Sequence, residues 1–339
     1  MNSEELEKTV AELMAPAKGI LAADESSGTI EKRFKSINVA STEENRRNYR
    51  EMLFTTPGLG EFISGVILYE ETLQQKTKDG TPLPQVLIHQ GIVPGIKVDK
   101  GTAPLANFPD DTVTQGLDGL ACRLAEYKQL GARFAKWRAV LRIGEKTPSQ
   151  RCIIENAHAL GRYAAICQEL GLVPIVEPEV LMDGSHSLEH CAEVTEQVLH
   201  AVFHALHQHR VRLEHMLLKP NMVIAGMDYR PQAEPEQVAK ATITCFRRAV
   251  PAAVPGIFFL SGGQSDAMAT ANLNALNAWP ERQPWCLSFS YGRALQAPAL
   301  KAWQGSAANA VMAQQALYKR ARLNSAARQG KYTVAMENT

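Results

Sequence analysis

The amino-acid sequence predicts an α/β fold, a (β/α)8 or TIM barrel built as a single domain. Three observations favour it. Eight apolar segments of strand length alternate with longer stretches whose apolar residues have helical spacing. The strand segments are continuously apolar, as expected when both faces of a sheet are buried. The 266 residues from Asp24 to Ser290 also give 38 residues for each of seven steps, enough for a strand, a helix and two loops.

An open doubly wound sheet is the competing fold, but no G-x-G-x-x-G motif follows the first strand. We assign residues 1–327 to the barrel and an N-terminal helix. We expect the polar tail, residues 328–339, to be flexible.

The predicted strands follow from short apolar runs. The third strand has two candidates, 85–89 and 94–98, and we choose the later one because Pro82 and Pro84 suit the start of a helix. In chain order the strands cover 19–23, 63–69, 94–98, 132–138, 173–177, 216–219, 256–260 and 286–290.

The predicted helices follow from amphipathic spacing and from capping residues. Ser149, Ser187 and Ser265 are suited to helix N-caps, and Gly131 and Gly171 stand where helices should end. The helices cover 117–130, 149–170, 187–209, 234–249, 265–278, 293–303 and 306–327.

Composition excludes several classes of partner. The 339 residues include 36 basic and 35 acidic side chains, so no global field favours nucleic acid or an anionic membrane. The first 18 residues carry acids at positions 4, 5, 7 and 12, unlike a targeting segment, and the apolar runs are too short to span a bilayer. The six cysteines form no C-x-x-C pair, which indicates free thiols in a cytoplasmic protein. Any attraction for an anionic substrate must come from a local cluster of cations.

Polar residues stand at the carboxyl ends of nearly all the predicted strands. Because these ends meet at one rim of a barrel, where active sites lie, we expect the side chains to converge. Residues two apart share a face, so Lys136 and Arg138 should point together into the barrel mouth. Glu177 and Glu179 should do the same, with Pro178 marking the end of their strand. The alternative is that these residues are unrelated surface charges in loops. It explains any single residue well, but it explains poorly why charges recur at the same end of the strands.

Lys219 stands out within this set. It follows Met-Leu-Leu and precedes Pro220, which predicts a strand end with apolar neighbours. Burial and the charge of Lys136 would lower its pKa, and a neutral lysine can form a Schiff base with a carbonyl substrate. The alternative is a structural lysine paired with Glu177 or Glu179, and spacing alone does not separate the two.

Two glycine turns predict an anion site. The segment Ser261-Gly262-Gly263 follows the seventh strand, and Tyr291-Gly292-Arg293 follows the eighth after Ser290. Glycine lets backbone N–H groups approach an anion, and barrel enzymes commonly bind phosphate in these two loops. Two ordinary turns are the alternative.

A second group of cations and hydroxyls is available for another phosphate, so the site would suit a bisphosphorylated molecule. The alternative for Arg33 and Lys97 is a solvated surface charge. The histidines give no H-E-x-x-H motif, and His200, His204 and His207 share one helical face, so we expect no metal. The members of the second group are Arg33, Lys97, Arg138, Ser26 and Thr29.

The motifs at these strand ends resemble those of class I fructose-bisphosphate aldolases. They include GILAADESSGTI (19–30), FAKWR (134–138), LLKPNM (217–222), FLSGGQS (259–265) and SFSYGRALQ (288–296). The resemblance runs from about Ala17 to Thr333. It implies reversible cleavage of fructose 1,6-bisphosphate into dihydroxyacetone phosphate and glyceraldehyde 3-phosphate, in glycolysis and gluconeogenesis. It also implies a Schiff base, no metal or other cofactor, and a homotetramer.

The resemblance also implies roles for individual residues. Lys219 would form the Schiff base, and Glu177 would be the acid/base that dehydrates the carbinolamine. Asp24 would take the proton of the C4 hydroxyl, Lys136 would hold the charges of Asp24 and Glu177, and Glu179 would support proton transfer. The phosphate nearer the ketone would meet Ser261, Gly262, Gly263, Ser290, Tyr291, Gly292 and Arg293. The other phosphate would meet Ser26, Thr29, Arg33, Lys97 and Arg138.

The sequence departs from animal members at its end. Those members finish in a tyrosine that aids proton exchange at C3, whereas this chain finishes Met336-Glu337-Asn338-Thr339. Either another group moves that proton or the step is slow. The departure leaves open a non-catalytic protein that binds sugar phosphates or acts as a scaffold. A transaldolase-like enzyme is opposed by phosphate groups at both ends of the site.

Overall fold

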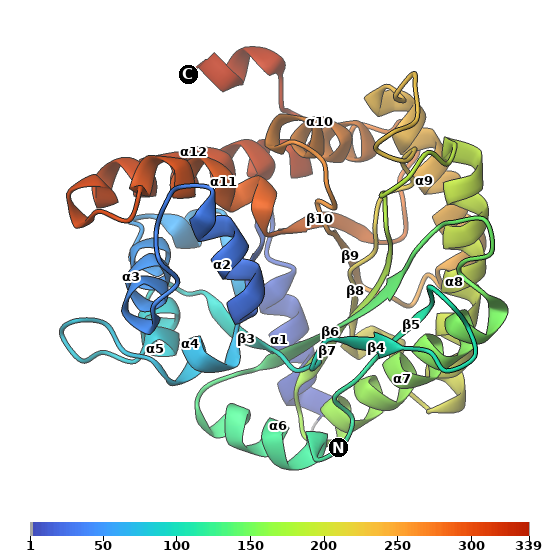
Figure 1. Ribbon diagram of the computed structural model, residues 1–339, viewed down its shortest axis with the longest axis horizontal. Helices are drawn as coiled ribbons and strands as arrows, with labels where there is room; N and C mark the ends of the chain where they lie inside the picture. Colours follow the sequence, from blue (N-terminus) through green and yellow to red (C-terminus); the bar gives the residue numbers. More distant parts are fainter. Residues whose placement is uncertain (1–2, 339) are drawn as a thin grey trace.

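A computed structural model describes residues 3–338, and it confirms the predicted barrel (Figure 1). Eight strands close in the order β1-β10-β9-β8-β7-β6-β3-β2, and each pairs in parallel with its neighbours. The strands are β1 (Gly19–Ala23), β2 (Ile63–Leu68), β3 (Val93–Lys97), β6 (Phe134–Leu141), β7 (Val173–Val180), β8 (Leu217–Leu218), β9 (Gly256–Phe259) and β10 (Cys286–Tyr291).

The helices begin where the capping residues predicted. The hydroxyls of Ser149, Ser187 and Ser265 accept the backbone N–H groups of residues three positions later and cap α7 (Gln150–Glu169), α8 (Leu188–Gln208) and α10 (Asp266–Asn277). The other long helices are α1 (Ser3–Leu13), α6 (Leu120–Gln129), α9 (Pro235–Ala249), α11 (Arg293–Trp303) and α12 (Ala310–Arg328). The segment 85–89 lies in α5 (Leu83–His89), which confirms the later choice for the third strand.

Two strands are longer than the sequence indicated. The strands β6 and β7 stay in register as far as the pair Leu141 and Val180, so Pro178 lies inside its strand and does not end it. The physical reason lies in the neighbour β8, which stops at Leu218. Val180 donates its N–H on that side to Asn221 Oδ1, at 3.0 Å, and Pro178 has no ladder partner there to lose.

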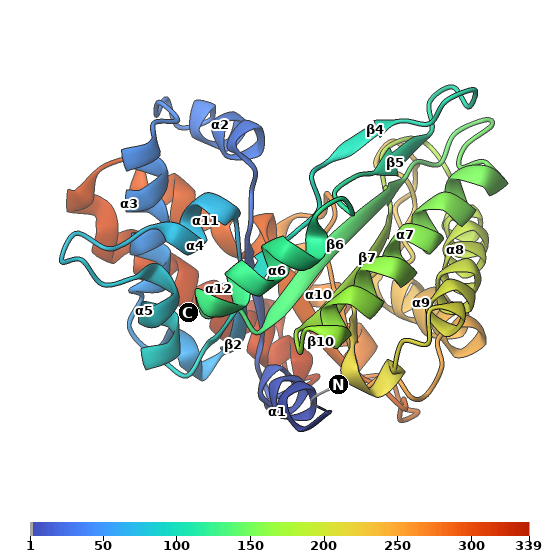
Figure 2. The same ribbon diagram turned by 90° about the horizontal axis from the view of Figure 1, so that it is seen from below.

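Further elements were not predicted, and several of them flank the rim. The helices α2 (Ser27–Lys35), α3 (Glu43–Phe54) and α4 (Glu70–Gln74) lie between β1 and β3 in the sequence. The strands β4 (Thr102–Pro104) and β5 (Thr112–Thr114) form an antiparallel ribbon outside the barrel. Figure 2 shows α2 and this ribbon on either side of one end of the barrel, with α1 at the opposite end.

The helix α1 closes the end of the barrel opposite the carboxyl ends of the strands. Its buried residues Leu6, Val10 and Leu13 pack in a cluster with inward-facing strand residues such as Phe134 and Phe258. The aromatic and aliphatic core at this end leaves the opposite rim as the place for polar side chains. None of the helices formed by residues 3–338 combines the length and the apolar character needed to cross a membrane.

The tail that we expected to be flexible is in contact with the barrel helices. Tyr332 is buried, and its hydroxyl donates to Glu337 Oε1 at 2.9 Å. Glu337 also pairs with Arg320 of α12, at 2.6 Å. Because Arg320 is buried, its charge needs this carboxylate, and the pair holds the short 3-10 helix Val334–Asn338 in place.

Candidate active site

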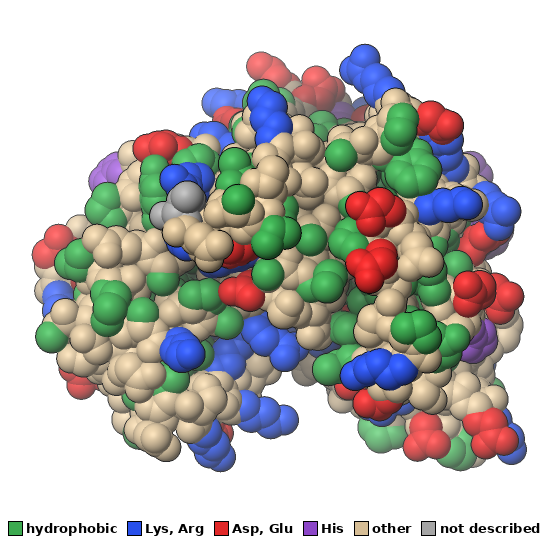
Figure 3. Space-filling view, turned by 90° about the horizontal axis from the view of Figure 1, so that it is seen from above, with side chains coloured by type: hydrophobic (Ala, Val, Ile, Leu, Met, Phe, Trp, Pro, Cys, Tyr) green, Lys and Arg blue, Asp and Glu red, His purple; other side chains and the backbone are tan. Residues whose placement is uncertain are grey.

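A cavity of about 270 Å³ opens at the carboxyl end of the barrel strands. Figure 3 shows the molecule hollowed on one side, with lysine and arginine side chains gathered in the hollow. All the residues predicted for the site line this cavity except Gly263 and Tyr291, and Ala22, Glu25 and Leu260 line it in addition.

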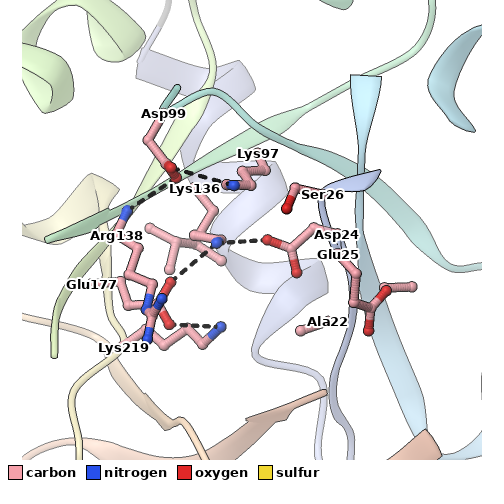
Figure 4. Close-up of polar contacts among 12 residues, drawn as sticks. Ala22, Asp24, Glu25, Ser26, Lys97, Asp99, Lys136, Arg138, Glu177 and Lys219 are labelled. Atoms are coloured by element: carbon pink, nitrogen blue, oxygen red, sulfur yellow. Dashed lines mark hydrogen bonds and ion pairs between the residues drawn. The ribbon is translucent and has the colours of Figure 1, made fainter. Parts of the chain in front are cut away.

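A chain of alternating charges crosses the centre of the cavity (Figure 4). The ammonium nitrogen of Lys219 lies 3.0 Å from Glu177 Oε1. The other oxygen of Glu177 lies 3.3 Å from Lys136 Nζ, which in turn lies 2.6 Å from Asp24 Oδ2. All four side chains are at most 12% exposed. The pairing of Lys219 that we weighed as the alternative is therefore present, and it joins Lys219 to the predicted acid/base.

The strand register places these groups together. Lys136 and Arg138 point inward from β6, whereas Trp137 between them packs outward on Tyr163 of α7, with ring centroids 5.6 Å apart. Lys97 is the register partner of Lys136, and Arg138 is the register partner of Glu177. Residues far apart in the sequence thus meet because neighbouring parallel strands carry them at one level.

Electrostatics fix the charge states of this chain. Burial would raise the pKa of Asp24, but the ammonium groups of Lys136 and Lys219 hold that pKa far below its ordinary value. Burial likewise opposes ionisation of Glu177, and the same two lysines lower its pKa. Burial disfavours the charged form of Lys136, yet Asp24 and Glu177 raise its pKa above the ordinary range. Lys136 is therefore a permanent cation between two carboxylates at neutral pH.

Glu179 lies beside the chain but has a different partner. Its carboxylate accepts a hydrogen bond from Arg138 Nε. Burial opposes the charge of Arg138, and Glu179 and then Glu177 raise its pKa nevertheless. Asp99 is a residue that sequence reasoning did not single out, although it stands two positions after Lys97. It is buried, lies 3.4 Å from Lys97 Nζ, and accepts the N–H of Arg138.

The two predicted glycine turns meet on one side of the cavity. Gly262 has a left-handed backbone with φ of 56°, and its carbonyl accepts a hydrogen bond from Arg293 Nη2 at 3.2 Å. Gly292 and Arg293 begin α11, whose N-terminal N–H groups favour an anion. The buried Ser290 Oγ has no hydrogen-bond partner among residues 3–338, so it is available to a ligand.

Tyr291 and Gly263 do not reach the cavity. Successive residues of β10 face opposite sides, so Ser290 points inward while Tyr291 points outward and donates its hydroxyl to the carbonyl of Ala269, at 2.8 Å. The backbone N–H of Gly263 is directed to the sulfur of Met182. The sequence correctly predicted that both residues lie next to the site. It did not predict the direction in which their polar groups point.

The second predicted phosphate group is assembled around α2. Ser26 occupies the N-cap position of this helix, and its hydroxyl lies 3.1 Å from that of Thr29. Arg33 reaches the cavity from α2 but is bound to the buried carboxylate of Glu25. The sequence predicted no role for Glu25.

The carboxylate of Glu25 is also held by two side chains that do not line the cavity. It accepts hydrogen bonds from Arg50 of α3, at 2.8 Å, and from Gln296 of α11, at 2.7 Å. Arg50 and Gln296 donate as well to the carbonyls of Ala23 and Ala22, and so hold the end of β1 that precedes Asp24. Arg50 has no sequence signal that would have linked it to the site, whereas Gln296 ends the motif SFSYGRALQ but was given no role.

No group of three or more histidine, cysteine, aspartate or glutamate side chains is arranged to hold a metal ion within the part of the chain that the structure describes. The helical face of His200, His204 and His207 lies on α8, outside the cavity. His200 and His204 line a separate groove between α7 and α8.

Comparisons with known proteins agree with the motifs. Residues 5–339 match the model of the family described as "Fructose-bisphosphate aldolase class-I". The chain is 55% identical over 333 residues to a "Probable fructose-bisphosphate aldolase class 1" of Xanthomonas campestris pv. campestris, covering 98% of this chain and 99% of that protein. It is 58% identical over 331 residues to "Fructose-bisphosphate aldolase 5, cytosolic" of Arabidopsis thaliana, covering 98% and 92%.

A solved structure is similar over the whole barrel. It is a fructose-bisphosphate aldolase from Plasmodium falciparum in complex with TRAP and a small molecule inhibitor. The TM-score is 0.96 at 52% identity, and the match covers 98% of this chain and 96% of that one. Family match, sequence identity and fold agree, and the chain belongs to the class I fructose-bisphosphate aldolase family of lyases.

Proposed function

We propose that the protein cleaves fructose 1,6-bisphosphate reversibly into dihydroxyacetone phosphate and glyceraldehyde 3-phosphate, through a Schiff base on Lys219 and without a metal. The charge chain Lys219–Glu177–Lys136–Asp24 carries this proposal. It supplies a nucleophile, an acid/base and a second base within one buried line, with the predicted phosphate groups around it.

The first half of the reaction forms the imine. Lys219 transfers a proton to Glu177, 3.0 Å away, and the neutral amine attacks the ketone carbon. A proton then passes from the nitrogen to the former ketone oxygen, which gives the neutral carbinolamine. Glu177 then returns a proton to the carbinolamine hydroxyl, which leaves as water while the nitrogen lone pair forms the C=N bond. The charge of Lys136 keeps Glu177 and Asp24 ionised between these steps.

The second half breaks the carbon–carbon bond. Asp24 takes the proton of the C4 hydroxyl, the C4 oxygen becomes the aldehyde carbonyl, and the electrons of the C3–C4 bond flow into the protonated imine. The imine is the electron sink that a metal would otherwise provide. Protonation at C3 and hydrolysis of the imine then release dihydroxyacetone phosphate and restore Lys219.

The phosphates are held at two places. Ser261, Gly262, Gly292, Ser290 and Arg293 bind the phosphate nearer the ketone through backbone N–H groups, hydroxyls and a guanidinium. The other phosphate is bound by the cluster around α2 and β3. The residues of that cluster are Ser26, Thr29, Arg33, Lys97 and Arg138.

The cellular setting follows from the same resemblance. The cytosolic isozymes among the relatives support a cytoplasmic enzyme whose small-molecule partner is a sugar bisphosphate. The balance of 36 basic and 35 acidic residues supports our proposal that neither nucleic acid nor a membrane is a partner. We extend the proposal to a homotetramer, which light scattering of the purified protein tests.

Trapping the imine tests the chemistry. Borohydride reduction in the presence of dihydroxyacetone phosphate should leave a stable adduct on Lys219, located by peptide mass spectrometry. A Lys219→Ala variant should form no adduct and lose activity, whereas Lys100→Ala, which changes an exposed lysine, should behave as the wild type. Normal turnover by Lys219→Ala, or complete inhibition by EDTA, contradicts the proposal. Binding without release of triose phosphate favours the non-catalytic alternative.

A further inference from the structure

Two methionines lie against the glycine loop, residues 261–264, and neither of them lines the cavity. Met182 follows β7, and Met227 lies in the long segment after β8. The backbone N–H of Met227 donates to the carbonyl of Met182 at 2.7 Å, and Gly226 and Asp228 bond to the segment 184–186. These hydrogen bonds join the two methionine segments to each other next to the glycine loop.

The sulfur of Met182 contacts the loop backbone directly, and that of Met227 lies close to it. Gly263 donates its N–H to Met182 Sδ. A Cβ added to Gly263 would lie 2.8 Å from Met182 Sδ and 3.1 Å from Met227 Sδ, and one added to Gly262 would lie 3.3 Å from Met182 Sδ. No room therefore remains between the loop and the sulfur of Met182 for one more heavy atom.

The same loop is held on its other side by the site. Gly262 lines the cavity, and its carbonyl accepts the hydrogen bond from Arg293. The position of the loop thus depends on the guanidinium of Arg293, which also lines the cavity, and on the thioether of Met182, which does not. A thioether is a weak acceptor, and its oxidation product, the sulfoxide, is larger, polar and a strong acceptor.

We propose that Met182 is a peroxide-modification site that controls the affinity of the glycine loop for phosphate. The peroxide transfers one oxygen to Met182 Sδ: its O–O bond breaks, an S–O bond forms, the sulfur loses two electrons, and hydrogen peroxide is reduced to water. The added oxygen cannot fit in the present contact with Gly263. The loop moves toward the cavity, and the N–H groups and Arg293 lose their common orientation toward the phosphate.

The position of the methionines allows this reaction. Met227 is 45% exposed and lies against the same glycine, so solvent reaches the outer side of the cluster, where Met182 is partly exposed. A third sulfur at the loop, that of Met222, accepts from Gln264 but is fully buried. Met312 on α12 is more exposed than either, at 53%, and does not line the cavity, so it offers a matched control.

The inference rests on the proposed function for the identity of the ligand, so the test measures binding as well as turnover. The protein is treated with hydrogen peroxide and then with dithiothreitol, which restores oxidised thiols such as that of the exposed Cys122 but leaves sulfoxides. Peptide mass spectrometry measures oxygen at Met182. Calorimetry gives the affinity for dihydroxyacetone phosphate, and a coupled assay gives KM and kcat.

We expect oxidation of Met182 to weaken the affinity and raise KM about tenfold, as for the loss of one hydrogen bond to a charged group. Methionine sulfoxide reductase should reverse the change. Met182→Leu should keep its KM after peroxide, Met312→Leu should respond as the wild type, and Met182→Gln should show the weakened affinity without peroxide.

Two results overturn the inference. One is an unchanged affinity in protein whose Met182 is fully oxidised. The other is an equal loss of affinity in peroxide-treated Met182→Leu and in the wild type. If Met182→Leu folds poorly, the affinities of untreated Met182→Gln and of the wild type for dihydroxyacetone phosphate are compared instead. Equal affinities would then overturn the inference. Failure of the borohydride adduct on Lys219 would refute the proposed chemistry, and the calorimetric comparison would still decide on Met182.

Discussion

Replacing Lys136 with methionine tests whether one buried cation holds the central charges in place. Lys136 lies between Asp24 and Glu177, at 2.6 and 3.3 Å, and its side chain is 4% exposed. Methionine keeps most of the volume of the side chain and removes its charge. Of the ion pairs in the charge chain, the variant then keeps that of Lys219 with Glu177, and Asp24 loses its ion-pair partner. Lys97 and Arg138 still lower the pKa values of Asp24 and Glu177, but with weaker effects than Lys136.

The magnitude follows from these distances. Two charges about 4 Å apart attract by about 4 kcal/mol at an effective dielectric constant of about 20. The cost of burying the lysine offsets part of this attraction, and removing one partner of a buried ion pair typically costs about 3–5 kcal/mol. We therefore expect the Lys136→Met variant to lose about 3–5 kcal/mol of unfolding free energy at pH 7.5.

The pH dependence separates this electrostatic cause from simple loss of packing. In the wild type the lowered pKa values of Asp24 and Glu177 contribute stability above the unfolded values of about 4, and this contribution is lost as the pH falls through the folded values. In the variant, burial acts on Asp24 without Lys136 to oppose it, which raises that pKa. The carboxyl then takes a proton on mild acidification, so the gap between the two proteins should narrow between about pH 6 and pH 4.

Urea unfolding at pH 7.5, 5.5 and 4 measures the gap, and Lys100→Met is the matched control. Lys100 makes a similar contact, 2.8 Å to Glu70, but both side chains are exposed by 40% or more. An exposed pair contributes about 0–1 kcal/mol, so the control should hardly change. A constant gap across this pH range, or equal losses in the two variants, would refute the electrostatic reasoning.

Three further predictions concern binding and catalysis. Glu177→Gln should lower kcat by about 10²–10⁴-fold and change KM only a few-fold in steady-state assays, because it removes proton transfer but leaves the phosphate groups; a raised KM with normal kcat would be the contrary result. Arg293→Ala should raise KM about tenfold or more with kcat nearly kept, and an unchanged KM would remove Arg293 from the phosphate site. Arg50→Met should lower the unfolding free energy by about 3–5 kcal/mol in urea titrations, because it leaves Glu25 with one guanidinium fewer, and a loss under 1 kcal/mol would mean that Gln296 and Arg33 suffice.

The barrel and most of the site could be predicted, because the barrel follows from the spacing of apolar residues and the site follows from the polar residues at the ends of the strands. Continuous apolar runs indicated buried parallel strands, and the rule that their carboxyl ends share a rim brought Asp24, Lys136 and Lys219 together. Alternation along β6 correctly placed Lys136 and Arg138 on one face. The same rule, applied to β10, would have separated Ser290 from Tyr291, and the prediction failed for Tyr291 because it treated the whole motif as pocket-lining.

The supporting groups could not be predicted, because their sequence context indicates exposure. Arg50 lies in α3 among the charged residues EENRRNYRE, which read as a solvated helix, yet its side chain is 1% exposed. Only the packing of α3 and α11 on the end of β1 brings Arg50 and Gln296 to Glu25. No spacing rule connects Gln296 with Glu25, 271 positions away, or Arg50 of α3 with the loop that holds Glu25.

Burial explains how a chain of net charge +1 presents a cationic site. Three cations at the cavity each pair with a carboxylate: Arg33 with Glu25, Lys97 with Asp99, and Arg138 with Glu179. The cations are 22%, 17% and 41% exposed, whereas their partners are 4%, 4% and 8% exposed. The cation is therefore the more accessible member of each pair, although Glu25 and Glu179 also line the cavity. An approaching phosphate meets the near charge of each pair first, so the pairs attract an anion although their sum is zero. The buried carboxylates hold these cations in place before the substrate binds, so the substrate adds its oxygens to groups that already line the cavity.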